Sequence, residues 1–204
     1  MVYISTILLS YLIGSVPFGV FAGRIAGVDI RKHGSGNIGA TNVLRTLGKK
    51  YGIAVFLADA LKGLIAVRLA VLFAGADPLY RSSLGVLAAI FVVIGHSFPI
   101  WLRFRGGKGV ATSGGACLGL LPGPTLIGGI VWILVFFAFR YVSVASIVAI
   151  AALPIAVWIL SDRGNSPNYL VFGFSVLIAL LVIWRHWENI VRLANGTEPR
   201  FNRK

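Results

Sequence analysis

Acidic residues are scarce in this sequence, whose 204 residues contain only 6 Asp and Glu against 19 Lys and Arg, for a formal net charge of +13. The carboxylates do not cluster along the chain. Magnesium-dependent phosphotransferases hold their ions with several neighbouring carboxylates. The scarcity of acids argues against that class, and we expect a protein that uses neither a metal ion nor a cofactor.

Two familiar catalytic patterns are also missing. None of His33, His96 and His186 has an Asp five residues later, so the His–Asp pair usual among glycerolipid acyltransferases is absent. No G-x-S-x-G nucleophile elbow is present. The single cysteine, Cys117, cannot form a disulfide within the chain.

Charged residues are few as well, at 12% of the chain, whereas they make up about a quarter of a soluble domain. Hydrophobic residues make up 57%, and several apolar runs reach the roughly 17–25 residues that cross a bilayer as a helix. The first run lacks the features of a signal peptide, so we expect a retained span. The sequence predicts one domain, residues 1–204, folded as an all-α polytopic transmembrane helical bundle with about seven spans, at 2–27, 51–74, 81–99, 109–121, 124–140, 142–161 and 168–190.

Turn-forming residues separate these runs. Asp77-Pro78, Pro122-Gly123-Pro124 and the polar string 161–168 are typical of breaks between helices. Because the fourth run is short, the fourth and fifth runs can instead form a hairpin, which leaves five full spans.

Positive charge is distributed unequally between the two sides of this topology. One side holds only Arg81 and Arg163, while Lys62 and Arg68 lie within the second span. An excess of Lys and Arg marks the cytoplasmic face. We therefore expect a protein of the inner, cytoplasmic membrane, with its N-terminus outside and its C-terminus in the cytoplasm together with Arg24, Arg31, Lys32, Arg45, Lys49, Lys50, Arg103, Arg105, Lys108, Arg140, Arg185, Arg192, Arg200, Arg203 and Lys204.

Two features of the predicted spans bear on packing. Ser15, Gly19 and Gly23 form a ridge of small residues at four-residue spacing, which is typical of closely packed helices. Asp59 and Lys62 lie three residues apart in the second span, where ionisable groups are costly and usually face inward. These two residues either neutralise each other or help to shape a site.

The stretch from Arg31 to Lys50, RKHGSGNIGATNVLRTLGKK, is polar, basic and glycine-rich, and it contains no carboxylate. Hydrogen-bond donors and positive charge without acids are what a phosphate ester requires. Its G-x-G-x-x-G pattern follows a membrane helix and not a strand, so a dinucleotide site is not expected. We expect an anion-binding site here, with a solvated basic loop as the alternative. A helix that begins near Asn37, just after Ser35, places on one face Asn37, Thr41, Arg45 and Lys49.

A second polar segment, GHSFPIWLRFRGGKGVAT, runs from Gly95 to Thr112. Its Gly-Gly-Lys-Gly run at 106–109 resembles a phosphate loop without the spacing or the hydroxyl of a Walker A motif, and Lys108 suits a phosphate clamp. The alternative is a membrane-interface loop, since Phe98, Trp101 and Phe104 surround the run. His96 is expected to be structural and not catalytic.

A third polar segment, RHWENIVRLANGTEPR, runs from Arg185 to Arg200. His186 and Asn189 lie three apart on one predicted helix face, which Asn195-Gly196 ends. The two residues either contact a substrate or have a structural role.

Three stretches within these segments, SGNIGATNVLRTLGKK, HSFPIWLRFRGGKGVAT and HWENIVRLANGTEPR, resemble the three signature motifs of the bacterial acyl-phosphate:glycerol-3-phosphate acyltransferases. The resemblance extends from near residue 1 to the C-terminus. It implies an integral membrane enzyme that transfers an acyl chain from acyl phosphate to the first hydroxyl of sn-glycerol 3-phosphate, giving lysophosphatidic acid and phosphate. This is the first acylation step of phospholipid biosynthesis.

The resemblance implies that the site is lined by Ser35, Asn37, Arg45, Lys108, His186 and Asn189, which agrees with the residues selected by charge and spacing. We expect as catalytic residues Ser35, Arg45, Lys108, His186 and Asn189. We expect as substrate-binding residues Gly36, Asn37, Thr41, Asn42, Arg105, Gly106, Gly107, Gly109 and Glu188. Phosphate is a good leaving group, so we expect direct attack by the glycerol hydroxyl, with either His186 or the leaving phosphate taking the proton. A covalent acyl-Ser35 intermediate is the alternative.

The expected partners are the two phosphorylated substrates and the phospholipid bilayer, on the cytoplasmic side, with the protein acting as a monomer. Nucleic acid is not expected, because the cations lie between spans and not on a soluble basic face. The rival function classes are a transporter for a phosphorylated solute and a non-catalytic lipid-binding membrane protein. A transporter would show related halves and polar groups near the membrane midplane.

Overall fold

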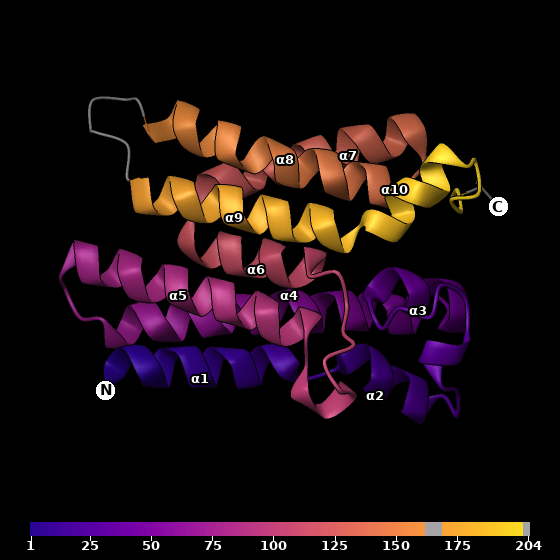
Figure 1. Ribbon diagram of the computed structural model, residues 1–204, viewed down its shortest axis with the longest axis horizontal. Coiled ribbons are helices and arrows are strands. Elements are labelled where there is room, and N and C mark those ends of the chain that lie inside the picture. The colour runs from indigo at the N-terminus through magenta and orange to yellow at the C-terminus, as the bar shows by residue number, and fades with distance from the viewer. Residues whose placement is uncertain (162–168, 202–204) are drawn as a thin grey trace. The chain divides into compact units, whose positions relative to one another are not determined.

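The computed structural model describes residues 1–161 and 169–201, and within them every regular element is a helix (Figure 1). The predicted all-α class is confirmed. The polar string predicted as a turn lies, apart from Ser161, outside the described residues. The elements are α1 Val2–Ser15, α2 Phe18–Ile25, η1 Ile30–Lys32, α3 Ala40–Leu47, α4 Lys49–Phe73, α5 Pro78–Ser97, η2 Ile100–Leu102, α6 Val110–Leu120, α7 Pro122–Phe139, α8 Val142–Ser161, α9 Tyr169–Arg185 and α10 Trp187–Ala194.

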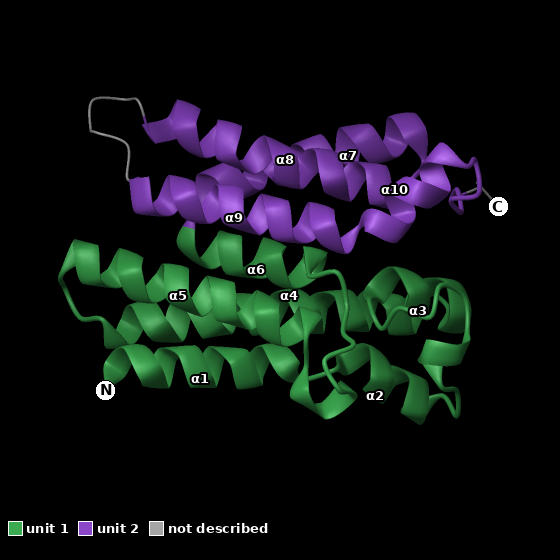
Figure 2. Ribbon diagram, in the orientation of Figure 1, with its two compact units in different colours: residues 1–120 green, residues 121–204 purple. Residues whose placement is uncertain are grey.

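The chain divides into two compact units, Met1–Leu120 and Leu121–Lys204 (Figure 2). In the first unit α1 packs along α5, and α4 packs along α6. In the second unit α8 contacts both α7 and α9. The first and second polar segments belong to the first unit, and the third belongs to the second.

Four helical segments of the described chain are long and apolar enough to cross a membrane: Val2–Ile25, Pro78–Leu102, Pro122–Phe139 and Val142–Ser161. The pair α9 and α10, bent by 55°, would add a fifth. Two predicted spans do not meet this standard. Helix α4 is 25 residues long but carries Asp59, Lys62 and Arg68, and α6 has only 11 residues, about 17 Å against a hydrocarbon core of about 30 Å.

The first predicted span is interrupted. Helix α1 ends at Ser15 and α2 begins at Phe18, because Pro17 has no N–H to continue the ladder and disfavours a helical conformation at Val16. The N–H groups of Val20 and Phe21 bond to the Pro17 carbonyl and so start a new helix. The small-residue ridge is divided by this break, with Ser15 on one helix and Gly19 and Gly23 on the other.

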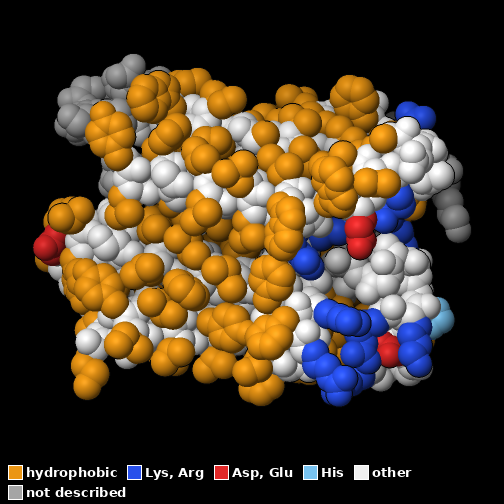
Figure 3. Space-filling model, viewed as in Figure 1, with side chains coloured by type: hydrophobic (Ala, Val, Ile, Leu, Met, Phe, Trp, Pro, Cys, Tyr) orange, Lys and Arg blue, Asp and Glu red, His pale blue; other side chains and the backbone are white. Residues whose placement is uncertain are grey.

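The surface of the protein is largely apolar. Leu134 of α7 is 65% exposed and Leu8 of α1 is 56% exposed, which is usual for helices that contact lipid. On the face shown in Figure 3, hydrophobic side chains cover most of the helices, while Lys and Arg side chains gather around α2 in the first unit.

Candidate active site

The first anion-binding segment is organised around a buried amide. Asn42, on α3, is only 2% exposed. Its Nδ2 donates to the carbonyl oxygens of Ile30, His33 and Asn37 at 3.2, 3.0 and 2.8 Å, and its Oδ1 accepts from the Ser35 N–H at 2.9 Å. One side chain thus fixes the whole loop from residue 30 to residue 37. Asn42, predicted to contact substrate, uses its polar atoms to shape the loop.

The loop that carries Ser35 needs glycine on both sides of it. Gly34 and Gly36 have φ angles of +58° and +68°, which L side chains rarely adopt, and a Cβ on Gly34 would collide with Oδ1 of Asn42. Ser35 is therefore held exposed at the tip of a tight turn, with its own N–H directed inward.

The predicted helix start near Asn37 is wrong. Asn37 lies in the loop, where its Oδ1 accepts from the Gly39 N–H at 2.8 Å, and α3 begins only at Ala40. An Asn side chain that bonds two residues ahead favours a turn over a helix. Lys49 is also off the predicted face, because Gly48 ends α3 with a φ of +89°. Thr41 and Arg45 remain, one turn apart on α3.

The loop is seated on α2. A Cβ on Gly19 would collide with the carbonyl oxygen of Ile38, and a Cβ on Gly23 with that of Val28. The buried side chains of Ile30 and Ile38 join Val20, Val43 and other residues in one apolar cluster beneath the loop. Gly19 and Gly23 therefore allow close packing, as predicted, but their partner is the loop. Ser15 packs against a neighbouring helix, since a Cβ on Gly95 of α5 would lie 3.0 Å from its backbone nitrogen.

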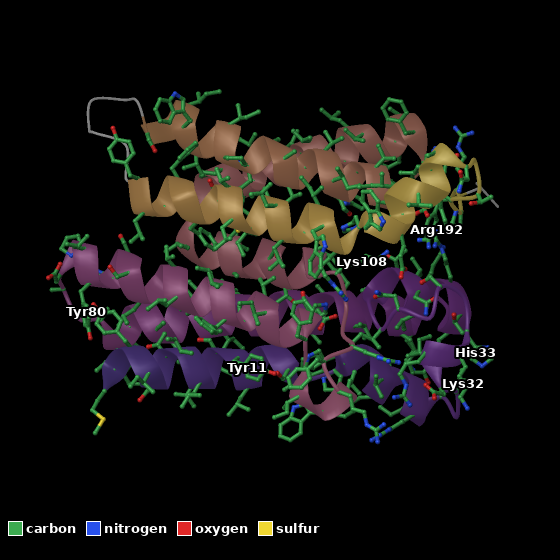
Figure 4. All side chains as sticks on the ribbon, viewed as in Figure 1. Tyr11, Lys32, His33, Tyr80, Lys108 and Arg192 are labelled. Atoms are coloured by element: carbon green, nitrogen blue, oxygen red, sulfur yellow. The ribbon has the colours of Figure 1, made fainter. Side chains whose placement is uncertain are left out.

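One carboxylate stands at the start of this loop. Asp29 caps η1 and pairs with Arg31 over 2.9 Å on the surface. The hydrogen bond from Arg31 lowers the pKa of Asp29 to about 2, so Asp29 stays ionised. Lys32 and His33 follow at the outer edge of the unit (Figure 4).

The second segment forms a loop against the end of α5. The N–H groups of Gly106 and Gly107 bond to the carbonyls of Ser97 and His96, each at 3.1 Å. A Cβ on Gly107 would collide with the His96 ring, so only glycine permits this contact. Gly109 then precedes α6, and the half-buried Lys108 stands beside the start of that helix (Figure 4).

The remaining residues of the second segment divide between surface and interior. Arg105 is exposed, and Trp101 and Phe104 are 62% and 58% exposed, as suits a membrane interface. The carbonyl of Phe98 accepts from the Tyr11 hydroxyl at 2.9 Å, which ties the segment to α1. His96 is 5% exposed, and its Nδ1 lies 3.0 Å from Nζ of Lys62, which supports the predicted structural role.

The third segment, in the second unit, bends at His186. This residue caps α10 and does not share a continuous helix with Arg185. Its ring is 3% exposed, with Nδ1 2.7 Å from the carbonyl oxygen of Val182. A carbonyl can only accept, so Nδ1 carries the proton, and Nε2 is the basic nitrogen of the neutral ring.

A carboxylate that the sequence did not single out holds the rest of the third segment. Glu198 Oε1 accepts from Asn189 Nδ2 at 2.7 Å, and Oε2 accepts from Arg192 Nε at 2.8 Å. Burial alone would raise the pKa of Glu198, but polar contacts from Ser143, Asn189 and the Arg192 cation outweigh it and keep the pKa below its usual value. The scarcity of acids could have drawn attention to Glu198. By contrast, Glu188 is 81% exposed and 3.9 Å from Arg192.

The arrangement is suited to binding phosphate through cations and backbone N–H groups. In the first unit, the loops at 30–39 and 106–109 each lead into a helix N-terminus, where amide dipoles favour anions. Among the described residues, no group of three His, Cys, Asp or Glu side chains could hold a metal ion.

Comparison with known proteins identifies the family. A family model described as glycerol-3-phosphate acyltransferase matches residues 4–196. Glycerol-3-phosphate acyltransferase from Desulforamulus reducens is 46% identical over 100% of this chain and 99% of its own, and that from Agrobacterium fabrum is 44% identical over 97% and 91%.

Solved structures agree with the sequence comparison. A crystal structure of PlsY (YgiH), an integral membrane glycerol 3-phosphate acyltransferase in its glycerol 3-phosphate form, matches with a TM-score of 0.88 and 39% identity, covering 98% of this chain and 96% of that one. The lysophosphatidic acid form matches with a TM-score of 0.86 and 38% identity, over 98% and 95%. Together with the apolar helices, this similarity makes the chain a multi-pass membrane protein. The chain belongs to the glycerol-3-phosphate acyltransferase family.

Proposed function

We propose that this protein transfers an acyl chain from acyl phosphate to the sn-1 hydroxyl of glycerol 3-phosphate, giving lysophosphatidic acid and phosphate, as the first acylation step of phospholipid biosynthesis. Relatives are named for acylation of glycerol 3-phosphate, and one is known in a glycerol 3-phosphate form and a lysophosphatidic acid form. Acyl phosphate is proposed as the acyl donor because the first unit has two glycine-rich segments that carry cations. Two such loops suit two phosphorylated substrates.

The proposed reaction is a direct attack. The glycerol oxygen forms a bond to the acyl carbonyl carbon, the bond from that carbon to the phosphate oxygen breaks, and phosphate leaves with the electron pair. The proton of the hydroxyl passes to Nε2 of His186 or to the departing phosphate. The orientation of the His186 ring supports the first route, since Nδ1 faces the Val182 carbonyl.

The proposed roles follow from chemistry and place. Arg45 and Lys108 neutralise phosphate charge. Further contacts to phosphate come from the first loop, through Ser35, Gly36 and Asn37, and from Thr41 in the first turn of α3. Gly106 and Gly107 shape the second loop, since their N–H groups bond to α5 carbonyls, while Gly109 opens onto α6. His186 and Asn189 orient the glycerol. The assignments of Arg105 and Glu188 as substrate contacts stay predictions.

The membrane arrangement is also part of the proposal. We assign a single domain, seven spans with α4 and α6 included, an external N-terminus and a cytoplasmic C-terminus in the inner membrane, with the site facing the cytoplasm and the monomer active. Single cysteines placed at either terminus in a Cys117→Ala background should react with an impermeant thiol reagent from opposite sides. Labelling of both termini from one side would contradict the odd span count.

The decisive experiment compares acyl donors. Purified protein is incubated with glycerol 3-phosphate and either acyl phosphate or acyl-CoA, and lysophosphatidic acid is measured. Product should form from acyl phosphate and not from acyl-CoA, and the reverse result would refute the assigned donor. Trapping of an acyl-Ser35 ester after rapid quench would replace direct attack with a covalent route.

A further inference from the structure

Three buried titratable side chains in the first unit have no part in the reaction as proposed. Asp59 and Lys62 lie on α4 and are 2% and 5% exposed, and His96 lies on α5 and is 5% exposed. Nζ of Lys62 is 2.7 Å from Oδ1 of Asp59 and 3.0 Å from Nδ1 of His96, and Asp59 Oδ1 is 3.5 Å from the same ring nitrogen. They form one cluster, which we call the Lys62 network.

Lys62 Nζ has three polar neighbours. It donates hydrogen bonds to His96 Nδ1 and to the carbonyl oxygen of Val16, which lies 2.9 Å away. With Asp59 Oδ1 it forms an ion pair. The Phe18 ring adds a cation–π contact, with its centroid 5.5 Å from Nζ. Because Nδ1 of His96 accepts, the proton of the neutral ring lies on Nε2.

One arm of the network leads to the first phosphate loop. Val16 is the residue at the break between α1 and α2, and Phe18 is the first residue of α2. Lys62 therefore fixes the start of α2. Helix α2 in turn carries Gly19, on which the Ile38 backbone of the loop is seated.

The other arm leads to the second phosphate loop. The Gly107 N–H bonds to the His96 carbonyl, and the Gly107 α-carbon packs so close to the His96 ring that no side chain fits between them. A change in the tilt of that ring would move Gly107 and the neighbouring Lys108. The ring is held by Lys62.

Stability alone does not account for such a network. A buried ion pair is often no more stabilising than apolar residues of the same volume, because desolvation offsets the attraction. Apolar residues could fill the space, but they could neither bond to the Val16 carbonyl nor orient the imidazole ring. These two tasks concern the positions of the loops.

We infer that Lys62, together with Asp59 and His96, is a positioning residue that fixes the two phosphate-binding loops relative to each other and so sets the affinity for the phosphorylated substrates without touching them. This inference rests on the proposed function, in which both loops bind phosphate. Misplacement of a loop by about 1 Å costs about 10²-fold in kcat/KM.

Two variants test the inference in the full-length protein. The double variant Asp59→Asn/Lys62→Met removes both charges and leaves no unpaired ion. His96→Asn keeps an acceptor for Lys62 but removes the ring beneath Gly107. The matched control is Ala66→Gly, which weakens α4 one turn beyond Lys62, at a residue that is 2% exposed. The readouts are KM and kcat for glycerol 3-phosphate, and the rise in Tm on adding glycerol 3-phosphate.

Both variants should fold and show a KM raised by about tenfold or more, the main part of that 10²-fold loss, with a smaller fall in kcat. The glycerol 3-phosphate-dependent rise in Tm should shrink in both, while Ala66→Gly should lower Tm with an unchanged KM. A folded variant with the wild-type KM and ligand-dependent Tm shift overturns the inference. If neither variant folds, the network serves folding itself and the positioning role is rejected.

The two proposals fail separately. If the wild-type protein makes no lysophosphatidic acid from acyl phosphate, the proposed donor is wrong, but the ligand-dependent Tm shift still tests the network. If the wild-type protein turns over and the variants match it in KM, the network inference alone is lost.

Discussion

Asn189 donates a hydrogen bond from Nδ2 to Oε1 of Glu198 over 2.7 Å, and so a predicted catalytic residue is held by one of the few carboxylates in the chain. The second oxygen of Glu198 accepts from Arg192, which closes the turn after α10. The position of the Asn189 amide therefore depends on a charge located nine residues later.

Substitution of Glu198 should cost both stability and activity. Glu198→Gln removes the charge that two donors share, and hydrogen bonds to charged groups contribute about 2 kcal/mol each, so we expect a clear fall in Tm and loss of turnover. Glu188→Gln is the matched control, because Glu188 is 81% exposed, and it should change Tm little. Equal Tm values for the two variants would show that the turn does not depend on Glu198.

The same carboxylate gives stability a dependence on pH. Since the folded-state pKa of Glu198 is lowered, its contribution is present above its unfolded pKa of about 4.3 and is lost as pH falls through the lower folded value. The Tm of the wild-type protein should therefore fall as the pH is lowered through this acidic range. Glu198→Gln should show a flatter profile there, and an unchanged profile would contradict the assignment.

Removal of a cation from the first or the second polar segment should abolish most of the activity. Arg45→Ala or Lys108→Ala should lower kcat/KM by about 10²–10³-fold, the usual effect of losing a preorganised electrostatic contact, with Tm nearly unchanged. Lys50→Ala, which removes an exposed cation at the start of α4, should retain activity. Wild-type kinetics in both Arg45 and Lys108 variants would exclude these residues from the site.

The Asn42 amide should be irreplaceable, even by its closest analogue. Asn42→Asp keeps the acceptor for the Ser35 N–H. It replaces the Nδ2 donor by a carboxylate oxygen, which repels the three carbonyl oxygens that now accept from Nδ2. We expect a disordered loop, seen as faster proteolysis between residues 30 and 39, and a raised KM for glycerol 3-phosphate. Asn195→Ala, at an exposed helix end, serves as control. An active, protease-resistant Asn42→Asp protein would contradict this role.

Two glycines seven residues apart should respond in opposite ways to the same change. Gly107→Ala places a methyl group against the His96 ring and should lower activity severely, while a methyl group at Gly114 meets nothing within 4 Å. Gly114→Ala should therefore stabilise α6 by about 0.5–1 kcal/mol and preserve turnover. The kinetics and Tm of the pair, measured together, check the prediction. Similar losses in both variants would mean that the His96 contact is not what requires glycine.

Much of the fold and part of the candidate site could be predicted from the sequence, because these features depend on local patterns. The apolar runs predicted the helices, and Gly-Gly-Lys-Gly and the Arg31–Lys50 stretch predicted two loops of the first unit. Turn chemistry near Asn37 was harder, since its side chain competes with the helix that spacing alone allowed. The bend at His186 could not be predicted either, because the apolar run of α9 continues directly into the amphipathic sequence of α10.

Long-range pairings could not be predicted. Lys62 and His96 are 34 residues apart, and nothing in either neighbourhood indicates that they meet. Asn42 bonds to the loop and not to a substrate because the loop folds back over α3. Glu198 reaches Asn189 because the chain turns back after α10. Such contacts arise from tertiary packing, so a sequence pattern supplies the residues but not their partners.

The pairing of Asp29 with Arg31 has a kinetic consequence. Asp29 is the last acid before a run that reaches Lys50 with four further cations and no carboxylate, so a positive field extends into the water over a Debye length of about 8 Å at physiological salt. A dianion that arrives from solution is drawn in by that field, and added salt slows its capture. An acyl phosphate that diffuses within the membrane plane gains less from it. Ionic strength should therefore affect the two substrates unequally, with the water-soluble one losing more of its rate of encounter.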